Sequence, residues 1–200
     1  MKAKIMLAGI IAGLLIMSSA GLRLASAQEH GHDHSALLNA LPKSKLKLAD
    51  GIRQAAKAHE VPISAKFELD DKGQLSLSVY TAEKGLTSDA EHNVLKELSG
   101  SPEKEQWSPE TEVFKDVEHV ARSAEQLTLM APSRFSLLEI IAKAEKQQPG
   151  TVFSITPVMR DRKPQFVVLV ANQGKVIELA YDLMTGNPMR SAKTHSATAR

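Results

Sequence analysis

The chain has 200 residues, of which 42% are apolar, 24% charged and 4% aromatic, and its formal net charge is +2. This length allows one or two domains with cores of their own, and the apolar content excludes a wholly disordered chain. The low aromatic content argues against an aromatic-lined ligand pocket or a base-stacking surface. The absence of cysteine excludes disulfides and lipid attachment through a cysteine.

Residues 1–27 have the pattern of a secretory signal peptide. Lys2 and Lys4 form a short basic region, residues 5–17 are an apolar run too short for a comfortable membrane span, and Ala27 ends a small-residue cleavage motif before Gln28. We therefore expect cleavage between Ala27 and Gln28, a periplasmic or secreted mature chain, and no stable membrane span after cleavage. The alternative is an uncleaved N-terminal anchor.

Cleavage would also change the charge balance of the chain. The signal holds three of the 25 Lys+Arg residues and no Asp or Glu, so the mature chain has 22 basic against 23 acidic residues and a net charge of −1. No polybasic stripe remains, so nothing favours nucleic acid as a partner.

Residues 28–42 are expected to form a flexible polar tail that contains His30, His32 and His34. Alternating histidines could hold a divalent ion such as Zn²⁺, Cu²⁺ or Ni²⁺ through imidazole nitrogens. The alternative is a solvated leader with incidental histidines, because ordering a mobile segment costs entropy. The other histidines are expected to be ordinary surface or boundary residues: His59, His92, His119 and His195.

The pattern between residues 45 and 80 predicts one helix and a β-hairpin. Apolar residues recur at helical spacing over 45–60, and Gly51 inside this helix would allow a strand to pack close. Strict apolar–polar alternation over 63–69 and 75–80 predicts two strands, each with one buried face. Asp70 and Asp71 precede Lys-Gly between these strands, so we interpret them as turn residues and not as paired acid–base carboxylates.

The region from Thr87 to Ser99 is expected to be a helical insertion. Ser88 and Glu91 fit a capping box, and apolar residues follow at helical spacing. A strand is expected near residues 110–115. Trp107, the only Trp, is interpreted as a lid on the core, the alternative being an exposed binding anchor.

A connector helix is predicted from Asp116 to Met130. Asp116 is a suitable N-cap, and an apolar face is expected from Val117, Val120, Ala121, Ala124 and Leu127. His119 and Arg122 are interpreted as solvated polar residues, although they could face an anion.

One helix and three strands are predicted between Ser136 and Pro188. Ser136 and Glu139 form a capping box, and Pro149-Gly150 ends the helix. Strands follow over 151–159, 166–170 and 176–181, with turns at 161–164 and 172–174.

This helix-and-strand pattern resembles the PepSY domain family over about 55 residues. The resemblance is carried by Leu137, Glu139, Ile140, Ala142, Ala144, Pro149-Gly150, Val152, the strands Phe166–Val170 and Ile177–Tyr181, Asp182, Thr185 and Gly186. It implies a helix packed on a small antiparallel sheet and a role in binding or inhibiting peptidases, with no shared catalytic residues.

A divergent copy of the same pattern precedes it, since Leu48 and Ile52 correspond to Leu137 and Ile141 at one constant offset. We therefore expect an α+β fold of two tandem PepSY-like units, residues 43–130 and 131–190, joined by the connector helix and followed by a disordered tail over 191–200. The spacing leaves open whether the two sheets lie side by side or form one continuous sheet.

Three functional hypotheses follow. The leading one is an exported, non-catalytic binding module that engages a protein partner, such as a peptidase or an envelope complex, through an open sheet face or edge. The second is a periplasmic metal-binding accessory protein that uses His30, His32 and His34. The third, an enzyme, has no support, because no phosphate loop, nucleophile elbow or zinc-protease motif is present.

Overall fold

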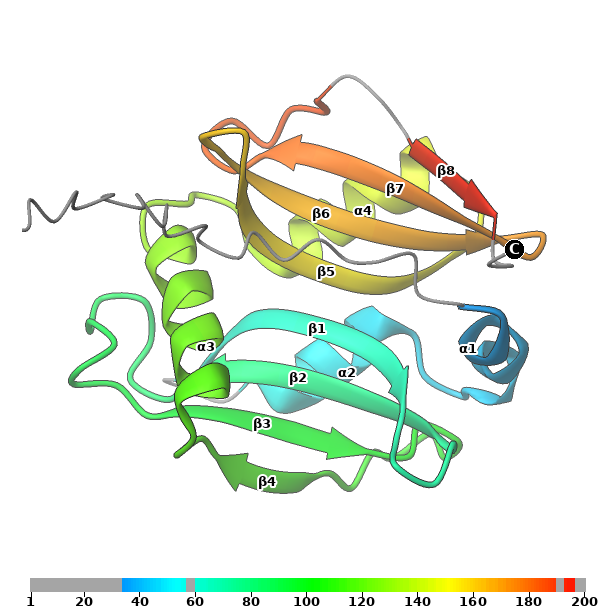
Figure 1. Cartoon of the computed structure of the whole chain (residues 1–200), viewed down its shortest axis with the longest axis horizontal. Helices are drawn as coiled ribbons and strands as arrows, with labels where there is room; N and C mark the ends of the chain where they lie inside the picture. The colour runs from blue at the N-terminus through cyan, green and yellow to red at the C-terminus, as the bar shows by residue number, and fades with distance from the viewer. Residues whose placement is uncertain (1–33, 57–59, 190–192, 197–200) are drawn as a thin grey trace, which may run out of the picture. The chain divides into compact units, whose positions relative to one another are not determined.

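All strands in the described part of the chain belong to one antiparallel sheet (Figure 1). The structure is a computed structural model that describes residues 34–56, 60–189 and 193–196. The strand order across the sheet is β4-β3-β2-β1-β5-β6-β7-β8. The strands are β1 Val61–Leu69, β2 Leu75–Ala82, β3 Leu95–Gly100, β4 Glu110–Val113, β5 Thr151–Arg160, β6 Lys163–Asn172, β7 Lys175–Asp182 and β8 Lys193–Ser196.

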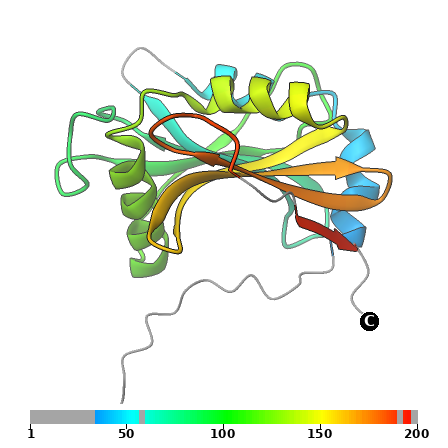
Figure 2. The same cartoon turned by 90° about the horizontal axis from the view of Figure 1, so that it is seen from above.

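Helices cover both faces of this sheet (Figure 2). The α-helices are α1 Ser35–Ala40, α2 Leu48–Ala55, α3 Val117–Met130 and α4 Leu137–Gln147, and a 3-10 turn, η1 Leu41–Lys43, follows α1. Helices α2 and α4 lie side by side on one face, whereas α1 and α3 lie on the other. The predicted α+β class is therefore confirmed.

The structure does not contain two separate tandem units: of the two sheet arrangements that the sequence left open, it has the single continuous sheet. The order helix-then-four-strands occurs twice, and Leu48 and Leu137 are each the first residue of their helix. However, β1 and β5 pair with each other, through Ala65 with Ile155 and Lys66 with Ser154, so the strands form a single sheet. All described residues also belong to one compact unit. Edge pairing satisfies backbone groups that two isolated sheets would leave open.

A glycine explains how closely α2 approaches the sheet. A Cβ on Gly51 would lie 2.2 Å from Cδ2 of Leu77, a fully buried residue of β2. Only a residue without a side chain fits there, as the sequence suggested. Leu48, Ile52 and Ala55 complete the buried side of the helix.

The predicted turns of the β-hairpins are confirmed. The Asp70 carboxylate accepts hydrogen bonds from the backbone N–H groups of Lys72 and Gln74. Between β5 and β6, Asp161 and Arg162 both have positive φ, and Gln173 and Gly174 do so between β6 and β7. Two consecutive residues with positive φ match the right-handed twist of the flanking strands.

The predicted helical insertion over residues 87–99 is wrong. Residues 83–94 form an irregular connection, and Leu95–Gly100 is strand β3, paired with β2. Ser88 caps no helix; instead Asp89 accepts a hydrogen bond from the backbone N–H of His92. Pairing with β2 outweighs the local helical spacing of Val94, Leu95 and Leu98. The strand expected near residues 110–115 is present as β4.

Both predicted tails are shorter than expected. Within the predicted flexible tail of residues 28–42, α1 begins at Ser35, and Leu41 is buried in the core. Within the predicted disordered tail of residues 191–200, β8 pairs with β7. The signal pattern and its cleavage site at Ala27 and Gln28 lie outside the described residues.

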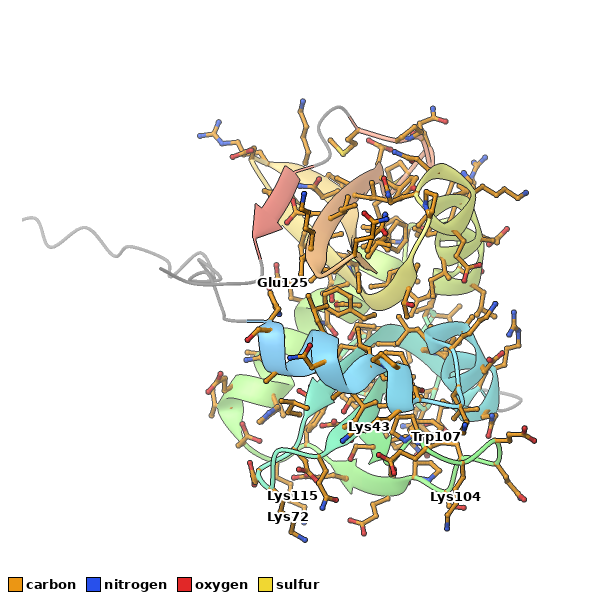
Figure 3. All side chains as sticks on the ribbon, turned by 90° about the vertical axis from the view of Figure 1, so that its right-hand side faces the viewer. Lys43, Lys72, Lys104, Trp107, Lys115 and Glu125 are labelled. Carbon is orange, nitrogen blue, oxygen red and sulfur yellow. The ribbon has the colours of Figure 1, made fainter. Side chains whose placement is uncertain are left out.

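Trp107 is buried, with 6% of its surface exposed. Its indole N–H points to the carbonyl oxygen of Gly100 at 3.4 Å, and its backbone N–H donates to the Gln54 side chain of α2. In Figure 3, Trp107 lies beneath α2, while Lys104 of the same loop points outward. Trp107 thus covers the core and is not an exposed anchor.

The connector helix α3 is present and capped by Asp116 as predicted, and Leu127 of its predicted apolar face is buried, but Val117 and Val120 of that face are exposed. Its buried residues are Ser123, Gln126, Leu127, Leu129 and Met130. Val117, predicted to be in the apolar contact face, is 86% exposed.

Candidate functional site

The two faces of the sheet differ in chemistry because the strands alternate strictly. On the face covered by α2 and α4, β1 and β2 contribute Ala65, Phe67, Leu77 and Val79, all buried. On the face that carries α1 and α3, the same strands present hydroxyl and charged groups. We call this second set the polar face: Ser64, Lys66, Glu68, Ser76, Ser78 and Tyr80.

The polar face lies where the two halves of the sheet meet. Lys66 pairs with Ser154 of β5 and with Ser78 of β2, so the row continues across the junction. Helix α3 is anchored beside it, since the Ser64 hydroxyl donates to the Gln126 side chain at 2.7 Å. Among the described helices, none lies over the middle of the face between α1 and α3 (Figure 1).

Three side chains form a hydrogen-bonded group at its centre. The Ser78 hydroxyl donates to Glu68 Oε1 at 2.6 Å, and the Lys66 ammonium forms an ion pair with Glu68 Oε2. The side chains of Lys66 and Glu68 are 36% and 32% exposed. A partner on this surface would therefore meet one cation and one anion, because the hydroxyl-bearing residues Ser64, Ser78 and Tyr80 are themselves buried.

Tyr80 connects this group to aromatic residues at the edge of the face. The Lys66 ammonium lies 5.7 Å from the centre of the Tyr80 ring, and the centres of the Tyr80 and Phe114 rings are 5.8 Å apart. His119 stacks on Phe114 at 5.2 Å and pairs with Asp116. The row therefore runs without interruption from β1 to the first turn of α3.

Lys66 and Tyr80 hold their protons firmly. Burial lowers the pKa of Lys66, but attraction to Tyr80 and Glu68 outweighs it, and the pKa rises above its ordinary value. Burial raises the pKa of Tyr80 to about 12, although nearby Lys66 acts in the opposite direction. At neutral pH Lys66 is thus charged and Tyr80 neutral, so both groups carry their protons and are poor bases.

The two edges of the sheet have different compositions. Strand β4 exposes all four residues, two of them glutamates, Glu110 and Glu112. Charged residues on an edge strand disfavour uncontrolled strand pairing. Strand β8 forms the opposite edge.

Two hollows lie away from the polar face. One, of about 90 Å³, lies at the first turn of α2 and is bordered by Lys47, Ile141 and Glu145. The other is an open depression of about 350 Å³ beside Lys143, Lys146 and Tyr181. In the depression Lys143 already donates to the Gly186 carbonyl oxygen at 2.7 Å, and the Tyr181 hydroxyl to Gln147 at 2.8 Å. Neither hollow gathers a catalytic set of side chains.

Of the predicted metal ligands, only His34 is described. Its ring lies edge-on to Phe153 of β5, with 5.9 Å between centroids. His30 and His32 lie outside the described residues, so their proposed metal site stays a prediction. Among residues 34–56, 60–189 and 193–196, no three His, Cys, Asp or Glu side chains converge as metal ligands.

The remaining predicted candidates are structural. His119 pairs with Asp116, and Arg122 with Glu118 at 2.8 Å, so both are engaged within α3. Sequence reasoning identified the alternation in β1 and β2 but did not single out Lys66, Glu68, Ser78 and Tyr80. The signal was present, because both strands of one hairpin carry only polar residues and Tyr at alternate positions.

Comparison of the chain with known proteins gives one distant structural match and no sequence match. No family model matches the chain, and no curated protein matches it. One solved structure, described as a "putative lipoprotein" from Clostridium difficile 630, is 12% identical and covers 68% of this chain and 84% of its own, with a TM-score of 0.38. Among the described helices, none is long and apolar enough to cross a membrane.

Proposed function

We propose that the chain is an exported, non-catalytic binding module that engages a protein partner through its polar face. The observation that carries this proposal is the contrast between the faces of one hairpin. One side is sealed by α2, while the other presents Lys66 and Glu68, each about one-third exposed, on a rigid sheet. Rigid, partly exposed polar groups beside aromatic rings suit protein recognition, because little entropy is lost when they bind.

The resemblance to PepSY domains supports a peptidase as the partner class, and the signal pattern over residues 1–27 supports export. A balanced ion pair also favours a protein surface over a small ligand, because small ligands need concave sites and neither of the two hollows described above lies on this face. Strand addition at the acidic β4 edge is the other route for a peptide partner.

The test uses residues 28–200, which include every described residue, as bait for a thermolysin-like metallopeptidase and for a native envelope extract. The key variant is Lys66→Glu with Glu68→Lys, which keeps an ion pair but reverses its direction. We expect the partner that binds the natural chain to be lost from this variant, while Glu110→Lys with Glu112→Lys at the β4 edge retains it.

The opposite pattern, retention by the face variant and loss from the edge variant, would replace face binding by strand addition. Retention by both variants, with circular dichroism showing both folded, would overturn the proposal for the polar face. Inhibition of casein hydrolysis by the metallopeptidase would establish peptidase regulation, and binding without inhibition would limit the module to docking.

A further inference from the structure

The open depression beside α4 has a counterpart in the first half of the sheet, and the strand pairing shows where it is. Leu77 of β2 pairs with Gly100 of β3. Phe166 of β6, which follows Leu77 at the offset that separates the first residues of α2 and α4, pairs with Tyr181 of β7. Gly100 and Tyr181 therefore occupy equivalent positions in the two halves.

The helices above these positions correspond in the same way. Gln54 and Lys143 are each the seventh residue of their helix, α2 and α4. In the second half, Lys143 and Tyr181 both border the open depression of about 350 Å³. The equivalent place in the first half therefore lies between Gln54 and Gly100.

In the first half, Trp107 of the β3–β4 connection fills this place. Its backbone N–H donates to the Gln54 side chain at 3.1 Å, its indole N–H points to the Gly100 carbonyl oxygen at 3.4 Å, and its side chain is buried beneath α2 (Figure 3). A Cβ on Gly100 would already lie 3.4 Å from the indole nitrogen. A tyrosine at that position, as in the second half, would take the place of the indole.

The second half has no such cover of its own. The connection between β7 and β8, residues 183–192, contains no aromatic residue. It contributes Gly186, Asn187 and Pro188 to the border of the depression. The two halves thus share a hollow under the same part of the helix, and the described residues leave the second one open.

The polar side chains around the open depression present hydrogen-bond donors. The Gln147 side-chain oxygen already accepts from the Tyr181 hydroxyl at 2.8 Å, so Gln147 has its NH2 group to offer. Lys143 and Lys146 can only donate, and the Asn187 side chain has no hydrogen-bond partner in the described part of the chain. Among the described residues, no Asp or Glu borders the depression.

The two positive charges are not neutralised by a carboxylate. The Lys143 ammonium donates to the Gly186 carbonyl oxygen at 2.7 Å and lies 4.4 Å from the centre of the Phe135 ring, contacts that position the charge without cancelling it. Lys146 forms no hydrogen bond or ion pair to a described residue. Glu139, one turn before Lys143, is engaged in the N-cap of α4. Two full charges outweigh the partial charge at the C-terminal end of the helix, about half an elementary charge of negative sign.

We infer that this depression, which we call the donor depression, binds the oxyanion group of a small ligand, a carboxylate or phosphate with at least two negative charges. Its volume falls within the range of small-molecule sites. Lysines recognise oxyanions as point charges, and Lys143 is already held in place, so little side-chain entropy is lost when it binds. This inference is independent of the polar face and of its partner.

The first test titrates ¹⁵N-labelled residues 28–200 with citrate and, separately, with inorganic phosphate, at constant ionic strength balanced with chloride. A few charge-assisted contacts on an open surface imply a dissociation constant of millimolar order, so the titration extends to about 20 mM. The amide of Asn187 belongs to the same peptide group as the carbonyl that Lys143 contacts, and it should shift saturably with at least one anion.

Saturation by citrate alone would assign the donor depression to carboxylates, and saturation by phosphate alone to phosphoryl groups. No shift at Gly186 and Asn187 with either anion would overturn the inference. Small, unsaturable shifts spread over lysines throughout the chain would overturn it as well, because they would show only general attraction between charges.

The second test compares two lysines of the same half. Lys146→Gln removes a charge from the donor depression, whereas Lys175→Gln removes one from an exposed position of β7 outside it. Lys146→Gln should raise the dissociation constant about fivefold or more, and Lys175→Gln less than about twofold. Equal weakening by both variants would overturn the inference.

A third variant changes the depression without removing a lysine. Asn187→Asp sets a carboxylate at its border, in an exposed turn, and should weaken binding at least as much as Lys146→Gln, because like charges repel. The amide spectrum of each variant shows that it is folded. Unchanged binding by folded Asn187→Asp would place the anion elsewhere and contradict the assignment of the site.

Discussion

Helices α3 and α4 follow each other in the chain, and each has a predicted apolar face, but only α4 buries that face along its whole length. In α4 the apolar residues at helical spacing are the buried ones: Leu137, Ile140, Ile141 and Ala144. In α3 Val117 and Val120 of the predicted apolar face are exposed, whereas the polar residues Ser123 and Gln126 are buried beside three large apolar ones, Leu127, Leu129 and Met130. Periodicity thus identifies a helix, but it does not determine which neighbour covers the apolar side.

The surfaces beneath the two helices explain the difference. Helix α4 packs on the apolar face, where β5 and β6 offer Ile155, Phe166 and Val168, all fully buried. Helix α3 packs beside the polar face, where Ser64 offers a hydroxyl that an apolar side chain would leave without a partner. The orientation of α3 that buries Gln126, Leu127, Leu129 and Met130 satisfies this hydroxyl and leaves Val117 and Val120 in water.

The largest contrast is expected from truncating one apolar side chain in each helix. Ile140→Ala should lower the free energy of unfolding by about 2–5 kcal/mol, because it leaves a cavity in a close-packed core. Val117→Ala should change it by less than about 0.5 kcal/mol, because the Val117 side chain is in water. Urea unfolding of the two variants and of the natural chain measures both changes.

Equal losses of unfolding free energy in Ile140→Ala and Val117→Ala would contradict the difference in burial between α4 and α3. A large loss for Val117→Ala alone would mean that its side chain is buried in the monomer in solution. Ala142→Gly, at an exposed position of α4, controls for general sensitivity of that helix and should cost about 1 kcal/mol.

The next largest effect on the free energy of unfolding is expected from the hydrogen bond between Ser64 of β1 and Gln126 of α3. Gln126→Leu should lower the free energy of unfolding by about 1–3 kcal/mol, because the buried Ser64 hydroxyl loses its acceptor. Ser123→Ala, one turn earlier, should raise it by about 1 kcal/mol, because it removes a buried hydroxyl without a described partner. Thermal and urea unfolding of both variants measure whether the free energy of unfolding falls in Gln126→Leu and rises in Ser123→Ala. Stabilisation by Gln126→Leu would show that the Ser64 hydroxyl finds another acceptor.

These helices show how far the sequence alone leads. The element types of both halves, the caps at Asp116 and Ser136 and the hairpin turns follow from local chemistry, and the structure agrees with them. Their signals lie within a few residues of each other, so no tertiary information is needed. Strand β3 was missed because Val94, Leu95 and Leu98 also fit a helix, and only pairing with β2 distinguishes the two.

The polar face and the single sheet depend on contacts between distant segments. Pairing of β1 with β5 rests on two residue pairs about 90 positions apart, which no local pattern specifies. The row from Lys66 through Tyr80 to Phe114 and His119 likewise joins three elements. Alternation predicts which residues share one face of a strand, but it does not reveal whether a helix will cover them.

The N-cap of α4 allows two variants of the same residue to be compared, with a smaller expected effect on the free energy of unfolding. Ser136→Ala should lower the free energy of unfolding by about 1 kcal/mol, because the Glu139 backbone N–H loses its side-chain acceptor. Ser136→Asp keeps an acceptor and should restore most of the loss, although it sets a second carboxylate near Glu139. Chemical unfolding at neutral pH measures both. Equal losses in the two variants would mean that Glu139, which accepts from the Ser136 backbone N–H, supplies most of the cap.

The same caps predict a pH dependence common to both helices. A hydrogen bond from the His119 backbone N–H, aided by the His119 side chain, lowers the pKa of Asp116, and bonds from Ser136 lower the pKa of Glu139. Because the folded pKa lies below the unfolded one, each carboxylate stabilises the fold above its ordinary pKa, and this stabilisation is lost as the pH falls through the folded pKa. Asp116→Asn and Glu139→Gln keep acceptors that do not titrate. Urea unfolding from pH 7 to pH 2.5 should therefore show each variant less stable than the natural chain at neutral pH, with the difference shrinking in acid. A difference that stays constant with pH would exclude the carboxylate charge as the source of either cap's stabilisation.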